Sequence, residues 1–146
     1  MELVAVSAMI DRDNYLRVCQ LDMSFDGTTP PSPAPGSPVA TECVRNKRSR
    51  EIAISPWERE IAQRLNDELR ACGIEQMLGA GGSHFGSDTH DVSWQITLYY
   101  GTADHPDGHR PRRSRWANGS WPAAQPEVIR TLAAVEAAVD HLMNHA

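Results

Sequence analysis

The clearest structural signal in the chain is the stretch SPWEREIAQRLNDELRACG, residues 55–73. Ser55 and Glu58 have the spacing of a capping box, and Pro56 stands at the first helical position. Apolar side chains then recur every three or four residues, at Trp57, Ile61, Leu65, Leu69 and Cys72. The final glycine follows, at the position where a left-handed residue ends a helix. The stretch therefore predicts an amphipathic helix over residues 56–72.

Five further stretches predict β-strands, because their apolar residues either alternate with polar ones or form short runs. They are residues 2–10, 15–25, 39–45, 48–54 and 92–100. The alternation is clearest in the last of these, where every second residue from Val92 is apolar. Asn46 and Lys47 separate two of the strands and suit a tight turn, because asparagine tolerates the left-handed conformation. Neighbouring strands are thus expected to form antiparallel hairpins.

A second amphipathic helix is predicted near the end of the chain, starting close to Gln125. Its apolar residues follow alternating spacings of four and three, at Val128, Leu132, Val135, Val139, Leu142 and Ala146. We expect this stripe to pack on the sheet. The alternative is a homodimer seam, which would make the protein an oligomeric structural subunit assembled through its C-terminal helix.

Together these elements predict one α+β domain over residues 1–146. We expect an antiparallel sheet of about five strands with two amphipathic helices packed on one face. Residues 26–38 hold five prolines in their last nine positions and predict a connector without regular structure. Residues 101–121 lack periodicity and predict a long irregular loop. A chain of this length buries enough surface to fold without a disulfide or a structural metal.

Composition limits the classes of protein to which the chain can belong. Its 146 residues carry 14 basic and 19 acidic side chains, a net charge of −5. This balance argues against a generic nucleic-acid coat or a basic membrane-surface protein. Thirteen of the basic residues are arginine, a bias common in GC-rich genomes, so we expect a bacterial or phage origin. Three cysteines without a C-x-x-C spacing, and a start without a basic leader, predict a reduced, cytoplasmic protein.

Basic residues concentrate in two short segments that contain no acid. The first holds Arg45, Lys47, Arg48 and Arg50, and the second holds Arg110, Arg112, Arg113 and Arg115, followed by Trp116 and Trp121. Guanidinium groups bind phosphate or carboxylate, and an exposed tryptophan can stack on a base. If the two segments converge, they form one anion site. We therefore expect a small non-enzymatic binding or accessory protein, for example a phage inhibitor or adaptor. Its partner would be a nucleotide, a nucleic acid or an acidic protein surface.

The glycine-rich stretch 79–91 supports an alternative function. His84, His90 and Asp91 could supply two imidazoles and a carboxylate to one divalent metal ion, as in a metal-dependent hydrolase. The stretch fails both the dinucleotide-binding and the P-loop patterns, so it predicts no nucleotide cofactor. No catalytic nucleophile is predicted either, because Cys72 lies on the apolar helix stripe, where a thiol is inert.

Overall fold

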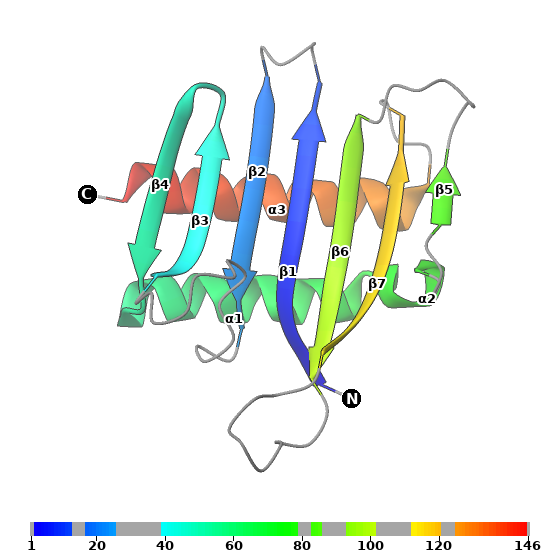
Figure 1. Ribbon diagram of the computed structural model, residues 1–146, viewed down its shortest axis with the longest axis horizontal. Coiled ribbons are helices and arrows are strands. Elements are labelled where there is room, and N and C mark those ends of the chain that lie inside the picture. Colours follow the sequence, from blue (N-terminus) through cyan, green and yellow to red (C-terminus); the bar gives the residue numbers. More distant parts are fainter. Residues whose placement is uncertain are drawn as a thin grey trace.

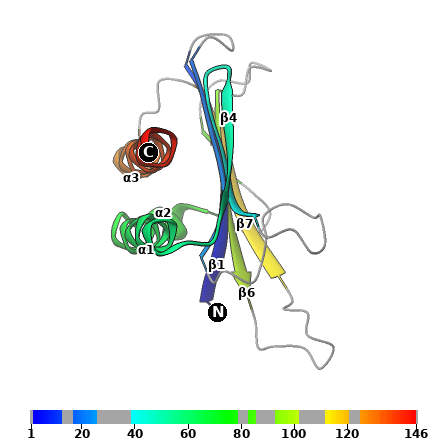
Figure 2. The same ribbon diagram turned by 90° about the vertical axis from the view of Figure 1, so that its left-hand side faces the viewer.

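In the computed structural model of the chain, seven strands form one sheet, and two long helices cover one of its faces (Figure 1; Figure 2). The strands are β1 (Glu2–Asp11), β2 (Val18–Ser24), β3 (Val39–Arg45), β4 (Arg48–Ala53), β5 (Ser83–Phe85), β6 (Trp94–Gly101) and β7 (Arg112–Gly119). The helices are α1 (Pro56–Ala71), α2 (Ile74–Met77) and α3 (Pro126–Asn144). The structure describes residues 2–12, 17–25, 39–78, 83–85, 93–101, 112–120 and 125–145.

The predicted α+β class is confirmed, with two more strands than expected. The strand order is β4-β3-β2-β1-β6-β7-β5, and every neighbouring pair is antiparallel except β5 and β7, which are parallel. The expected irregular loop over residues 101–121 is wrong for Arg112–Gly119, which form β7. This segment shows no hydrophobic alternation, and its pairing with β6 makes it a strand. The proline-rich connector predicted over residues 26–38 lies outside the described residues.

β1 is the central strand of the sheet and the most deeply buried one. It pairs with β2 along one side and with β6 along the other. Val4, Ala5 and Val6 are completely shielded from solvent. A continuous apolar run at the start of the chain is typical of a buried central strand. The described helices cover one face of β1, and Ser7 and Met9 on the other face are partly exposed.

α1 begins and ends close to the positions that the sequence predicts. The Ser55 hydroxyl accepts a hydrogen bond from the Glu58 backbone N–H at 3.3 Å, and proline occupies the first helical position. Cys72 caps the end of the helix, and Gly73 follows with a φ of 80°, in the left-handed region. The predicted tight turn is also confirmed, because Asn46 has a φ of 59° between β3 and β4.

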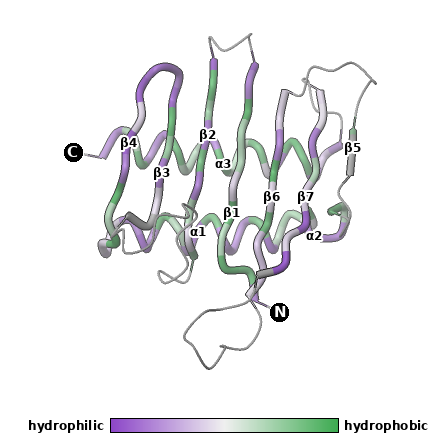
Figure 3. The backbone as a smooth tube through the Cα atoms, in the orientation of Figure 1, coloured by the Kyte–Doolittle hydropathy of each residue, from purple (hydrophilic) through white to green (hydrophobic). Residues whose placement is uncertain are grey.

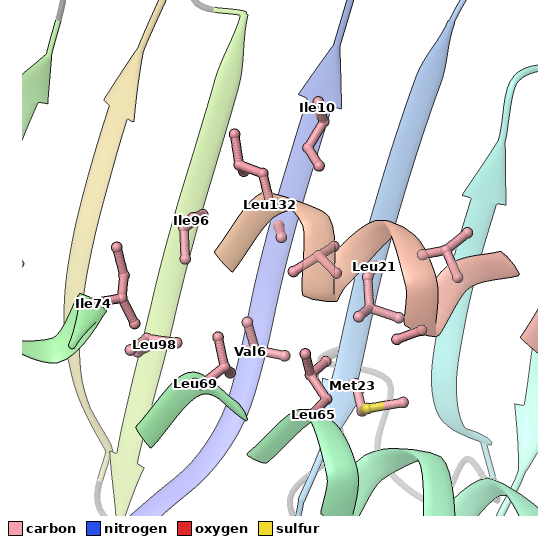
Figure 4. Packing of buried hydrophobic residues seen from close by; sticks show 14 of the residues in the cluster. Val6, Ile10, Leu21, Met23, Leu65, Leu69, Ile74, Ile96, Leu98 and Leu132 are labelled. Atoms are coloured by element: carbon pink, nitrogen blue, oxygen red, sulfur yellow. The ribbon is translucent and has the colours of Figure 1, made fainter. Parts of the chain in front are cut away.

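α3 packs its apolar stripe on the sheet. The stripe residues Val128, Leu132, Val135, Val139 and Leu142 are all buried within a single chain. Figure 4 shows Leu132 reaching toward the strands that carry Ile10 and Ile96. Since the sheet already covers this stripe, it is not available as the homodimer seam considered from the sequence.

A buried ion pair joins the start of α1 to the edge half of the sheet. The Glu58 side chain is fully buried and accepts a hydrogen bond from the Thr41 hydroxyl at 2.9 Å. Arg59 donates its Nε to the same carboxylate at 2.6 Å and a second guanidinium N–H to the Ser24 carbonyl oxygen at 2.8 Å. These contacts connect α1, β2 and β3, because both charges are satisfied only when the three elements are in place.

Removing this carboxylate should strongly destabilise the fold. We expect Glu58→Ala to lower the free energy of unfolding by about 3–5 kcal/mol, because Arg59 would keep its charge without its partner. Urea denaturation followed by circular dichroism measures the change. The control is Glu60→Ala, which breaks the exposed pair between Glu60 and Arg64 and should cost about 0.5 kcal/mol or less. Equal losses in the two variants would contradict the role given to Glu58.

A glycine is required where β5, β6 and β7 meet. A Cβ atom on Gly119 would overlap the Phe85 carbonyl oxygen and the indole ring of Trp94, which is itself fully buried. We expect Gly119→Ala to cost roughly 1–3 kcal/mol of unfolding free energy, because backbone must move to admit the methyl group. Thermal unfolding measures this loss. Ser114→Ala, at an exposed position of the same strand, should leave the melting temperature nearly unchanged.

Candidate anion-binding site

On the half of the sheet formed by β2, β3 and β4, acidic and basic side chains lie on opposite faces. Asp22, Glu42 and Glu51 are direct neighbours across β2, β3 and β4, and they alternate with core residues that face the helices. Arg45 and Arg50 share the helix-covered face with the buried Cys43 and Ile52. The arginines therefore lie on the same face of the sheet as α3, whereas the carboxylates lie on the opposite face.

The two basic segments do not form one site. The first lies at the β3–β4 hairpin and the second begins β7, with β2, β1 and β6 between them. Four strand spacings separate β3 from β7 by about 19 Å. The hydrophilic hairpin and the hydrophilic start of β7 also lie at opposite ends of the strands (Figure 3). Arg110 and Trp121 lie outside the described residues, and Arg112 is described by its backbone alone.

Two arginines of the second segment, Arg113 and Arg115, lie on the opposite face of the sheet from Trp116. Arg115 lies opposite Leu98 on the helix-covered face, with its guanidinium carbon 5.7 Å from the ring centroid of Tyr100. Trp116 lies opposite Thr97, on the other face of the sheet. Burial, reinforced by the nearby Glu75, raises the pKa of Tyr100 to about 12. Arg115 and Trp116 therefore cannot hold one partner group together.

One carboxylate on α3 gathers arginines from two hairpins. Glu136 has a side chain only 12% exposed and forms ion pairs with Arg12 and Arg45. The Arg45 contact measures 3.4 Å, and Arg45 lies at the same distance from Asp140, one helical turn further along α3. Arg12 follows β1 directly and Arg45 ends β3, so Glu136 joins the β1–β2 end to the β3–β4 hairpin.

These side chains surround a cavity of about 240 Å³. Its lining consists of Ile10, Arg12, Arg17, Cys19, Arg45, Asn46 and Glu136. Three arginines and one glutamate thus line the cavity, together with an isoleucine and a buried cysteine. Arg17 is exposed and forms no ion pair with any described residue. A guanidinium without a partner, beside two that a carboxylate holds in place, is suited to bind an incoming anion.

A second cavity, of about 380 Å³, adjoins the first. It is lined by Arg45, Asn46, Lys47, Arg48, Asp140, Met143 and Asn144. Arg45 and Asn46 belong to both cavities, so the first lies next to the second along α3. Three of the four basic residues predicted in the first segment therefore line one or both cavities.

Arg50, the fourth residue of that segment, supports the end of α3 instead. Its guanidinium donates to the Leu142 carbonyl oxygen at 2.6 Å and to the His145 carbonyl oxygen at 2.9 Å. It also lies 5.6 Å from the ring centroid of Trp57, which stacks on His145 at a centroid distance of 3.8 Å. A cation at a helix C-terminus satisfies free carbonyl groups and opposes the helix dipole.

Arg12 and Arg17 are functional candidates that the sequence analysis missed. They flank the connection between β1 and β2, and Arg17 breaks the apolar alternation expected for residues 15–25. No local pattern in the sequence groups them with Arg45. The β1–β2 and β3–β4 connections lie at the same end of the sheet because β2 pairs with β3. This pairing brings both arginines to the same cavity as Arg45.

The predicted metal site receives no support from the described part of the chain. Within it, no three histidine, cysteine, aspartate or glutamate side chains come together in a way that could hold a metal ion. His84 belongs to β5 and pairs with Asn118, and its side chain is not described. His90 and Asp91 lie outside the described residues.

The thiol on the floor of the first cavity should be chemically inert. Burial raises the pKa of Cys19 to about 12, although Arg45 opposes this shift, so the reactive thiolate does not form near neutral pH. We expect the native chain to resist the thiol reagent DTNB at about pH 8 and all three cysteines, which are buried, to react after unfolding in urea. Absorbance of the released thiolate measures both rates. Rapid labelling of Cys19 in the native protein, located by mass spectrometry, would contradict this expectation.

Comparison with protein-family models, with curated proteins and with solved structures finds no match to this chain. Among the helices that the structure describes, none is both long and apolar enough to cross a membrane.

Proposed function

We propose that the protein is a small non-enzymatic binding protein that holds an anionic partner in the cavity lined by Arg12, Arg17 and Arg45. The observation that carries this proposal is the convergence of three guanidinium groups, from two separate hairpins, on one cavity with a single carboxylate. Such groups bind phosphate and carboxylate through charge-assisted hydrogen bonds, often two at a time.

The site is organised before a ligand arrives. Glu136 holds Arg12 and Arg45 in place, so these side chains have already lost much of their rotamer freedom in the free protein. Less entropy remains to be lost on binding, which favours affinity. Arg17 supplies the additional positive charge that no described carboxylate neutralises.

The distribution of charge favours the entry of an anion at this end of the sheet. The chain as a whole is acidic, with a net charge of −5, yet Lys47 and Arg48 add two exposed cations beside the three arginines. A local positive region on an acidic body directs anions to that region and away from the rest of the surface. The burial of all three cysteines argues against a cysteine nucleophile. An accessory role, as an inhibitor or adaptor in a bacterial or phage setting, fits a protein of this kind.

Replacement of the unpaired arginine tests the proposal. We expect pyrophosphate to bind the protein and Arg17→Ala to weaken this binding by about tenfold or more, because a hydrogen bond to a charged group contributes roughly 1.5–3 kcal/mol. Isothermal titration calorimetry measures both affinities. Arg64→Ala is the matched control, because Arg64 lies on α1 in an exposed pair with Glu60 and should leave the affinity unchanged.

Salt dependence separates the classes of partner at the same site. A small anion held by a few arginines should lose affinity moderately with added salt, whereas a nucleic acid should show a steep linear fall of log K with log[salt]. If pyrophosphate does not bind, or binds equally well to Arg17→Ala, the arginine-lined cavity is not the anion site.

A further inference from the structure

We propose that the free edge of β4 binds an extended peptide of a partner protein. Its basic side chains face Glu51, and its apolar side chains lie on the helix-covered side of the sheet. Such a peptide adds one further strand to the sheet through main-chain hydrogen bonds. The proposed peptide site is independent of the anion site, because it depends on the backbone of β4 and on the sheet face that no described helix covers.

β4 has backbone hydrogen-bonding groups that the described chain leaves unused. It is the last strand at its edge of the sheet and pairs only with β3 among the described strands. Arg45 and Arg48 flank a two-residue turn and therefore form a hydrogen-bonded pair. Backbone groups alternate in direction along a strand, so Ser49 and Glu51 direct their N–H and C=O groups away from β3. No hydrogen bond within the described residues reaches these outward groups, which makes the edge a template for another strand.

The opposite edge of the sheet is a poorer template. It is formed by β5, which has three residues, whereas β4 has six. A longer edge strand offers a peptide more main-chain hydrogen bonds, so β4 is the edge at which a peptide would pair.

The uncovered face of the sheet beside β4 has negative charge without a described counter-charge. Asp22, Glu42 and Glu51 lie directly opposite one another across β2, β3 and β4. None of them forms an ion pair with a cation among the described residues. Like charges directly opposite in a sheet are destabilising, whereas opposite charges stabilise the pairing. Glu51 is the exposed end of this row, so a lysine or arginine beside it on an added strand would supply the counter-charge.

The helix-covered side of the same edge offers apolar and aromatic surface. Ile54 connects β4 to α1 and is 51% exposed. Trp57 is partly buried and stacks on His145 at a centroid distance of 3.8 Å. Arg50 holds the end of α3 at this place, and α3 extends to the β4 edge of the sheet (Figure 1). Since side chains alternate between the faces of a strand, every second residue of the peptide would lie on this side, where apolar residues fit.

A second copy of the chain fits this edge less well than a peptide of different sequence. In an antiparallel pair of two β4 strands, each side chain stays on its own face, so the two-fold axis passes through one residue position. Most of β4 overlaps when that position is Arg50 or Glu51. The first register sets two guanidinium groups opposite each other, and the second sets two carboxylates opposite each other. A partner with basic and apolar side chains in alternation avoids both conflicts.

Binding of designed peptides to the full chain tests this proposal. The probes are end-blocked peptides of about eight residues that alternate valine with lysine, or valine with glutamate, and fluorescence anisotropy measures their affinities. We expect the lysine peptide to bind about tenfold or more tightly than the glutamate peptide. Glu51→Lys should reverse this preference, because it changes the sign of the nearest charge. Glu60→Lys is the matched control, because it makes the same change at an exposed position of α1 and should leave the preference as it is.

Methylated peptides test the main-chain pairing separately from the charge. Methylation of the backbone nitrogen at every second residue of the lysine peptide removes the donors from one of its two edges. One alternate set of methyl groups should abolish binding, and the other set should leave it nearly unchanged. If both sets are tolerated equally, the peptide is held by charge alone and the proposed strand addition is wrong.

Three further results separate the alternatives. No binding of the lysine peptide, or an unchanged preference in Glu51→Lys, overturns the proposal. A stable dimer of the free chain, detected by light scattering and closed to the peptide, shows that a second copy occupies the edge instead. Arg17→Ala, which tests the anion site, should not change peptide binding, so the failure of one proposed site is distinguishable from the failure of the other.

Discussion

The arrangement at one end of the sheet depends on the carboxylate of Glu136. It lies almost buried between α3 and the strands and forms ion pairs with Arg12 and Arg45, which come from different hairpins. Without it, Arg12 and Arg45 would lose their shared counter-charge beside a small cavity, at a cost in electrostatic energy, and Arg45 would keep its contact with Asp140. Arg50 acts at the C-terminal end of the same helix, where it donates hydrogen bonds to the last carbonyl groups. Arginine side chains thus hold α3 against the sheet and also line the candidate site.

This dependence explains why arginines concentrate on the helix-covered face. An arginine near the edge of a sheet can lay its aliphatic stem against the core and extend its guanidinium to a helix carbonyl or carboxylate. Asp22, Glu42 and Glu51 lie on the other face, which no described helix covers, and they are neighbours across the strands. Arginines on this face therefore both stabilise the fold and line the candidate binding site. Arg50 is committed to architecture, whereas Arg17 is free of any ion pair with the described residues.

About half of the candidate site was predictable from sequence. The β3–β4 hairpin and its cations followed from the strand pattern around Asn46, and the structure places three of those cations at the cavities. Arg12 and Arg17 were not grouped with them, because 28 positions separate Arg17 from Arg45 and no local pattern records that β2 pairs with β3. The second basic segment was joined to the first by charge alone. The strand order separates them, since three strands lie between β3 and β7.

The sequence by itself determined the elements whose signals are local. α1 follows from a capping box, a proline, a stripe and a glycine, all within 19 consecutive residues, and the α+β class follows from two such helices beside alternating strands. Only the tertiary structure decided that Arg112–Gly119 form a strand, because its stability comes from pairing with β6. The same holds for the position of Arg12, Arg17 and Arg45 around one cavity that Glu136 also lines. Contacts between residues far apart in the chain are set by strand order and helix packing, and neither leaves a periodic trace in the sequence.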